Sequence, residues 1–238
     1  MKDVNRVALI IQARVNSSRL PGKMILPFAD SNLVEISIEK VKKSNFPISN
    51  FYLSIRDQEI IDISKKHGVN YYYRSDNSVR NDDIVAFTLP EVLEWWDKLD
   101  YDYYILMSAC NPLLKISTLN SFIDSFMNSD YDSLMSVIEH KRFFFKPNGE
   151  IFQEYNGTEQ QKRTFNTKFV EPIYSAGPLR AGKMSDIGKH IYMGDFNVPD
   201  SVPFFKYNSD EYIDIDYRWE FEAAQALYKE KKKLTKDI

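Results

Sequence analysis

The sequence predicts an α/β fold with a doubly wound, mostly parallel sheet. Two observations lead to this prediction. Short apolar segments alternate with amphipathic ones through the first 140 of the 238 residues, and the first apolar segment, 7–11, is continuous, without intervening polar residues. Continuous apolar runs are typical of strands buried on both faces, and alternation with helices indicates crossovers between parallel strands. Functional sites in such sheets lie at the carboxyl ends of the strands.

The elements follow from the spacing of the apolar residues. Strands are predicted at 7–11, 51–55, 69–73, 103–107 and 134–138, with a further extended segment at 211–216. Helices are predicted at 32–44, 58–67, 83–99, 116–127 and about 217–233. Gly68 ends the second helix in the usual C-terminal position. The expected apolar face of the last helix consists of Trp219, Phe221, Ala223, Ala226 and Leu227.

Residues 140–175 interrupt this pattern. Short aromatic and polar runs with turn signals at 147–149 and 156–157 indicate hairpins in place of another crossover. We interpret this segment, called the excursion below, as part of a single domain that spans 1–238. Aromatic residues form 14% of the chain. Tyr52, Tyr72, Tyr103 and Trp219 are assigned to the core, whereas Phe143, Phe144, Phe145, Phe152, Tyr155, Phe165, Phe169 and Tyr174 crowd the excursion, as an interface or a ligand pocket would require.

Composition narrows the class of protein. The net charge of −3 and the pI near 5.7 argue against a nucleic-acid partner. A lone Cys110 can form neither an internal disulfide nor a thiolate metal site. The apolar run 7–11 is far too short to span a membrane. We therefore expect a cytoplasmic protein without a membrane partner.

The loop after the first strand, 12–23, places three cations and two hydroxyls at the expected functional edge of the sheet. Cationic side chains, hydroxyl donors and free backbone N–H groups are what a polyphosphate binds. The loop has neither the Walker spacing nor the glycines of a dinucleotide fingerprint. A solvated basic turn is the alternative, and the position at the sheet edge favours the functional interpretation.

This loop contains the motif Ala13-Arg14-x-x-Ser17-x-Arg19-Leu20-Pro21-Gly22-Lys23, with Asn16 where glycine is usual in similar proteins. The motif resembles the opening motif of the sugar cytidylyltransferases, which include acylneuraminate, 3-deoxy-manno-octulosonate and spore-coat polysaccharide enzymes. The resemblance implies a Rossmann-like nucleotidyltransferase in which this loop wraps the triphosphate of CTP. It implies catalytic roles for Arg14 and Lys23, and nucleotide contacts for Ser17 and Arg19.

Two further segments extend the resemblance toward the C-terminus. Ser108-Ala109-Cys110-Asn111-Pro112-Leu113-Leu114 shares Pro112 and Leu113 with a stretch of the acylneuraminate enzymes, which implies nucleotide contacts for Ser108 and Asn111. Ile213-Asp214-Ile215-Asp216 matches both aspartates of a late family motif. If the segment is extended, both carboxylates point to the same side, which suits Mg²⁺. Alternatively, Asp216 caps the helix that follows.

The resemblance implies roles for three other residues. Arg74 follows the third strand, where related enzymes carry an arginine near the nucleotide; a loop ion pair is the alternative. Basic residues flank the excursion, and acylneuraminate enzymes bind the sugar with residues of this region. Arg163 and Tyr174 are thus candidates for binding an acidic sugar, with surface charge as the alternative for the basic residue.

The function expected from the resemblance is a CTP-dependent cytidylyltransferase with Mg²⁺ as cofactor. It would activate an acidic 2-keto sugar, either a sialic-acid-like nonulosonic acid or an octulosonic acid, with release of pyrophosphate. Relatives are commonly homodimers built through the excursion. Alternatives are a nucleotidyltransferase for another sugar or base, and a catalytically silent binding homologue. A glycosyltransferase is disfavoured because no Asp-x-Asp pair directly follows the fourth strand, where one would be expected, and Asp214-x-Asp216 comes too late.

Overall fold

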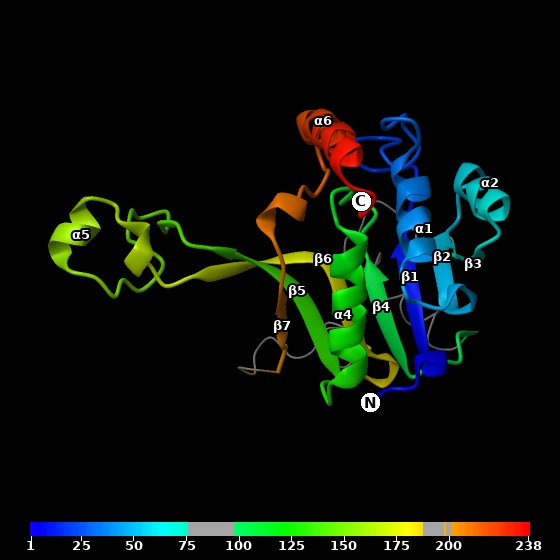
Figure 1. Cartoon of the computed structure of the whole chain (residues 1–238), viewed down its shortest axis with the longest axis horizontal. Coiled ribbons are helices and arrows are strands. Elements are labelled where there is room, and N and C mark those ends of the chain that lie inside the picture. The colour runs from blue at the N-terminus through cyan, green and yellow to red at the C-terminus, as the bar shows by residue number, and fades with distance from the viewer. Residues whose placement is uncertain (76–97, 188–197, 199–200) are drawn as a thin grey trace.

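The computed structural model describes residues 1–75, 98–187, 198 and 201–238, which contain a seven-stranded sheet of order β3-β2-β1-β4-β6-β5-β7 (Figure 1). Among these strands, β6 alone runs antiparallel to its neighbours. The mostly parallel α/β sheet is therefore confirmed. The strands are β1 (Val7–Gln12), β2 (Phe51–Ile55), β3 (Asn70–Tyr73), β4 (Tyr103–Met107), β5 (Ser133–His140), β6 (Ile173–Lys183) and β7 (Phe204–Lys206).

Four of the five described helices agree closely with the sequence prediction. The five are α1 (Leu33–Lys43), α2 (Gln58–His67), α4 (Ile116–Asn128), α5 (Glu159–Arg163) and α6 (Arg218–Leu234). Helix α5, which lies where hairpins were expected, was not predicted. Asn32 caps α1 by accepting the backbone N–H of Glu35, and Gly68 ends α2 with φ 62°. The helix predicted at 83–99 lies almost wholly outside the described residues. In the described part of the chain, no helix combines the length and apolarity needed to cross a bilayer.

Both faces of β1 are buried, which explains its continuous apolar sequence. Leu9 and Ile11 join the main core, which α1, α2 and α4 cover on one face of the sheet (Figure 1). Ala8 and Ile10 belong to a second cluster, with Tyr104 and Leu106 of β4. Burial on both faces is typical of parallel strands in α/β proteins. The loops that leave β1 and β4 therefore start from fixed positions at the carboxyl edge.

Two strands were missed by the sequence analysis. β6 inserts between β4 and β5, and β7 pairs with the outer side of β5. Gly177, Pro178 and Gly182 give β6 a composition that is unfavourable for strands, which hid it. The pairing of β5 with β6 shifts register here, because the step from Met135 to Val137 in β5 corresponds to the longer step from Arg180 to Ala176 in β6, which marks a bulge in β6. The extended segment expected at 211–216 contains no strand; a 3₁₀ turn (Ser209–Glu211) precedes an irregular stretch.

The apolar face assigned to α6 was wrong in part. Phe221 is buried as predicted, but Trp219 is 66% exposed and Leu227 is 46% exposed. The buried face of α6 instead runs through Ala224 and Tyr228, three and seven residues after Phe221. Trp219 lies within α6, two residues before Phe221, and this spacing places it about 200° around the helix axis, on the side opposite the buried face. The face packs on Phe28, whose ring centroid lies 5.2 Å from that of Phe221 and 5.5 Å from that of Tyr228.

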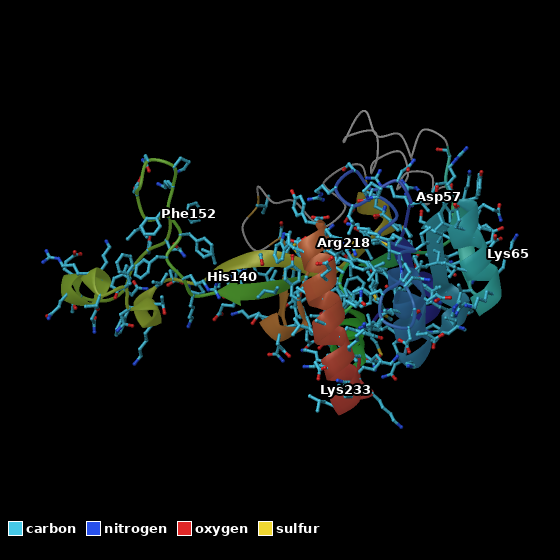
Figure 2. All side chains as sticks on the ribbon, turned by 90° about the horizontal axis from the view of Figure 1, so that it is seen from above. Asp57, Lys65, His140, Phe152, Arg218 and Lys233 are labelled. Carbon is cyan, nitrogen blue, oxygen red and sulfur yellow. The ribbon has the colours of Figure 1, made fainter. Side chains whose placement is uncertain are left out.

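The excursion projects from the sheet as an arm formed by the ends of β5 and β6, with α5 far from the body (Figure 1). The predicted turn at 147–149 is confirmed, because Gly149 has φ 84° and donates its N–H to the carbonyl of Lys146. Phe143 stacks on Tyr155 and meets the edge of Phe165, so the arm has a small aromatic core. Phe152 nevertheless stays 62% exposed, far from Arg218 of the body (Figure 2).

Candidate active site

The loop after β1 is folded back on itself and anchored to α2. Asp57, at the start of α2, accepts the backbone N–H of Val15 at 2.7 Å. The carbonyl of Val15 accepts the N–H groups of Ser17 and Gly22, each at 2.9 Å. Gly22 has φ 73°, a conformation that favours glycine, whereas Asn16 does not have a positive φ. The asparagine therefore fits the turn without strain.

The loop delivers two cations to one carboxylate of the late acidic segment. Lys23 is buried and donates to the carbonyl of Ile215 at 2.5 Å and to Asp216 Oδ1 at 3.0 Å. Arg19, more exposed, reaches Asp216 Oδ2 at 2.6 Å. Burial opposes the charge of Lys23, but Cys110 and Asp216 outweigh it and raise the pKa of the lysine. The Lys23 ammonium is therefore held charged.

The two aspartates lie close together but have different partners. Burial, and then the charge of Asp216, raise the pKa of Asp214, although Lys23, Arg19 and Arg180 act in the opposite direction. Asp216 does not cap α6, because the N-cap residue of this helix is Tyr217 and both carboxylate oxygens of Asp216 contact Lys23 and Arg19. Glu220 accepts the backbone N–H groups of Asp216 and Tyr217 at 2.7 and 2.8 Å. The helix-cap alternative for Asp216 is therefore wrong, and its carboxylate serves the loop cations.

The segment after β4 joins this acidic segment directly. Asn111 is 2% exposed, and its Oδ1 accepts the backbone N–H of Ile213 at 3.2 Å. The carbonyl of Cys110 accepts the N–H of Ile215 at 3.0 Å. Ser108 Oγ accepts the N–H of Cys110 at 3.2 Å. The three motifs singled out in the sequence thus meet at the carboxyl ends of β1 and β4.

A cavity of about 270 Å³ opens beside this junction. Its walls come from the ends of β1 and β4, from β6 and from the acidic segment. The lining residues are Gln12, Leu106, Met107, Ser108, Cys110, Asn111, Ala176, Gly177, Pro178, Arg180, Tyr212 and Asp214. Its polar groups combine amide, hydroxyl, guanidinium and carboxylate chemistry, as expected of a site for a polar, charged ligand.

Four other predicted residues do not line this cavity. Arg14 lies in the loop after β1 and is half-buried. Arg74 is buried directly after β3, where its backbone N–H donates to Ile55. Tyr174 lies on β6 outside the cavity, and its hydroxyl donates to Glu139 at 3.3 Å. Arg163 is exposed on α5, at the far end of the excursion.

Sequence reasoning missed several residues of the site. Arg180, Gly177 and Tyr212 line the cavity, and the first two belong to the strand that the sequence analysis did not predict. Gln12 was detectable, because it is the polar residue that ends the first apolar run. Asp57 gave no signal, because its contact with the loop joins residues 42 positions apart.

Asp214 and Asp216 are the residues of this site that could hold a divalent cation. In the ranges that the structure describes, no group of three or more His, Cys, Asp or Glu side chains is arranged for a metal ion. Two carboxylates suit a hard cation that keeps several waters and binds substrate phosphates, as Mg²⁺ does. They do not form a cage made entirely of protein ligands.

Comparison with known proteins identifies the family. The sequence profile described as "Cytidylyltransferase" matches residues 8–170. The chain belongs to the cytidylyltransferase family. This cytidylyltransferase is 25% identical over 230 residues to pseudaminic acid cytidylyltransferase of Campylobacter jejuni subsp. jejuni serotype O:23/36 (strain 81-176), covering 92% of the chain and 95% of that relative. Over 124 residues it is 26% identical to 3-deoxy-manno-octulosonate cytidylyltransferase of Chloroherpeton thalassium, covering 52% and 47% of the two chains.

The fold of this cytidylyltransferase is also found among solved structures. CMP:2-keto-3-deoxy-manno-octonic acid synthetase, solved in complex with CTP, superposes with a TM-score of 0.68 at 12% identity, covering 95% of this chain and 99% of that one. At such low identity, the likeness shows the fold alone. Family membership and fold together confirm a nucleotidyltransferase enzyme with a Rossmann-like sheet.

Proposed function

We propose that this cytidylyltransferase transfers CMP from CTP to the anomeric hydroxyl of an acidic 2-keto sugar. The observation that carries the proposal is the cluster of Arg19, Lys23 and Asp216, set beside Asp214 at the edge of the cavity. Cations for a triphosphate and carboxylates for its metal thus share one sheet edge. The names of two relatives, which contain pseudaminic acid and 3-deoxy-manno-octulosonate, support an acidic sugar.

In the proposed reaction, the hydroxyl oxygen of the sugar attacks the α-phosphorus, and the bond to pyrophosphate breaks. Such transfers depend on positioning and on neutralisation of charge. Arg14 and Lys23 would stabilise the departing pyrophosphate, and the raised pKa of Lys23 keeps it cationic for this role. Ser17 and Arg19 would contact the phosphates.

Three further residues are candidates for contacting the nucleotide. Arg74 follows β3, and Ser108 and Asn111 follow β4, so all three belong to the carboxyl edge of the sheet. Ser108 and Asn111 also line the cavity. We propose that these residues bind the nucleotide.

Asp214 and Asp216 fit a Mg²⁺ ion that accompanies the triphosphate. In the described part of the chain, the carboxylate of Asp214 makes no ion pair, and the neighbouring Asp216 raises its pKa. Two adjacent carboxylates favour a cation between them. When bound, the metal supplies charge neutralisation for the phosphates, and Lys23 and Arg19, which now contact Asp216, are placed to contact the same phosphates.

The test is release of pyrophosphate with each of the four nucleoside triphosphates and a panel of 2-keto acid sugars. CTP with at least one acidic sugar should give turnover, and no release with CTP and any acidic sugar would refute the proposal. Asp214→Ala and Asp216→Ala should abolish Mg²⁺-dependent turnover while the circular dichroism spectrum is unchanged. Asp210→Ala, an exposed aspartate paired with Lys231, is the matched control and should keep full activity.

We further propose that the excursion forms a homodimer interface. The side chains of Phe145, Phe152 and Phe165 are exposed on the arm. A monomer usually exposes aromatic residues singly, so three on one arm favour an interface. A second copy would also bring Arg163 and its arm toward a neighbouring cavity, as the predicted contact with the sugar requires. Sedimentation equilibrium should give a dimer for the wild type and a monomer for Phe152→Ser combined with Phe165→Ser. A dimer in both would contradict this interface.

A further inference from the structure

The cavity contains a cation that is separate from the cations of the triphosphate loop. Arg180 lies on β6, opposite Leu106 of β4 and Met135 of β5. Its backbone is therefore held by paired strands on both sides, and its position depends on the sheet and not on a loop. Sites built on strands hold their side chains more precisely than sites on loops.

Two donors of this cavity wall have no acceptor among the residues that the structure describes. Arg180 Nε is buried without a hydrogen-bond partner, and Arg180 forms no ion pair with any described residue. Nδ2 of Asn111 is also buried without a hydrogen-bond partner in the described part of the chain. This side chain is 2% exposed, and its Oδ1 already accepts the N–H of Ile213. Buried donors are almost always paired, so two unpaired ones that line one cavity indicate acceptor atoms on the ligand.

The two donors lie at the same end of the cavity. Asn111 bonds directly to Ile213, and the positive charge of Arg180 acts on the flanking residues Tyr212 and Asp214, where it opposes the rise in pKa that burial causes in each. Both donors therefore surround the segment 212–214.

The ligand group that suits Arg180 is a carboxylate. A guanidinium is a planar fork that binds a carboxylate through two parallel hydrogen bonds. The phosphates of CTP are the other source of anionic oxygen, but their proposed cations belong to the loop after β1. Strand β4 lies between β1 and β6, so the two groups of cations start about 10 Å apart across the sheet.

We infer that Arg180 binds the carboxylate of the acceptor sugar and selects acidic sugars over neutral ones. This inference rests on the proposed function, because it takes the sugar of that reaction as the ligand. Arg180 is then the residue that determines specificity, whereas the loop after β1 handles the nucleotide.

The experiment compares Arg180→Met and Arg180→Lys with the wild type in the pyrophosphate-release assay, varying the sugar and CTP separately. Lys183→Met is the matched control, because Lys183 lies on the same strand and pairs with Asp132 at 3.7 Å, away from the cavity lining. Arg180→Met should raise the KM for the acidic sugar by about 10- to 100-fold, the range for loss of a charged hydrogen-bond pair. Its KM for CTP should stay within about twofold.

A second comparison uses the amide of the same sugar, which lacks the negative charge. The wild type should prefer the acid strongly, Arg180→Met should lose most of this preference, and Arg180→Lys should keep part of it, since lysine retains the charge but not the fork. Calorimetric titration with CTP alone and a thermal melt verify that each variant is folded.

The outcomes separate the two proposals. Wild-type turnover with an unchanged sugar KM in Arg180→Met overturns the inference alone. If Arg180→Met loses affinity for CTP and for the sugar equally, the arginine binds the phosphates, and this result also overturns the inference. A wild-type enzyme without turnover on any acidic sugar overturns the proposed function, and the inference with it.

Discussion

Lys40 is a lysine in the core whose removal should change how stability depends on pH. It is 2% exposed on α1 and donates to the carbonyls of Pro112, at 2.7 Å, and Leu114. Burial lowers its pKa from 10.5 to about 7. The charges that act on it are Glu211 and Asp237, which raise the pKa, and Lys43 and Lys231, which lower it. The perturbation is Lys40→Met, which keeps the length and apolar volume of the side chain.

The size of the effect follows from the two pKa values. Because the folded pKa lies below the unfolded one, the unfolded chain binds more protons between pH 7 and 10.5, and the folded state gains stability as the pH rises through this window. From pH 6 to pH 9, this gain in the wild type amounts to about 2.7 kcal/mol. Lys40→Met lacks the gain. It also leaves two buried carbonyls unpaired, a loss of about 1–3 kcal/mol each that does not vary with pH.

The assay is urea unfolding of the wild type and Lys40→Met at pH 6, 7, 8 and 9. The difference in free energy of unfolding between the two proteins should widen by about 2–3 kcal/mol from pH 6 to pH 9. Lys42→Met, on the exposed side of the same helix, should run parallel to the wild type. Parallel curves for the wild type and Lys40→Met would refute the reasoning, because they would mean that Lys40 titrates alike in the folded and unfolded chains.

Two other predictions concern the walls of the site. Gly177→Ala should destabilise the protein by about 1–3 kcal/mol, since a Cβ there would stand 2.5 Å from Ser136 Oγ and 2.6 Å from Tyr207 Cε1; an unchanged urea midpoint would contradict this close approach. Asp57→Ala removes the 2.7 Å bond from Val15 N–H that anchors the loop after β1. It should raise the KM for CTP by about tenfold with little change in melting temperature, and an unaltered KM would show that the loop keeps its shape without this anchor.

The parts of the fold that the sequence predicts are those in which local pattern and burial agree. Strand β1 reads as an uninterrupted apolar run because helices and a second cluster bury both of its faces. By contrast, β6 contains Gly177 and Pro178, which weaken any strand signal, and its place in the sheet depends on pairing with β4, some 70 residues earlier. Such long-range pairing leaves no trace in a local window.

The candidate site likewise contains residues that the sequence identifies and residues that it does not. Lys23 and Asp216 were identifiable because each belongs to a compact motif, and the structure joins them at 3.0 Å. Arg180 was not identifiable, since a single arginine in an unpredicted strand resembles any surface charge. Trp219 shows the opposite error: a large apolar residue near a helix start was assigned to the core, although helical geometry places it about 200° around α6 from the buried Phe221.

The bulge in β6 gives the arm a measure of independence from the candidate site. On one side of it, Arg180 stays in register with both β4 and β5; on the other, β6 has only β5 as a neighbour and runs into the arm. A bulge lets a strand pair bend and twist locally without breaking its register farther on. Evolution can therefore lengthen, tilt or recoat the arm to suit a new partner while the geometry around the substrate is inherited unchanged.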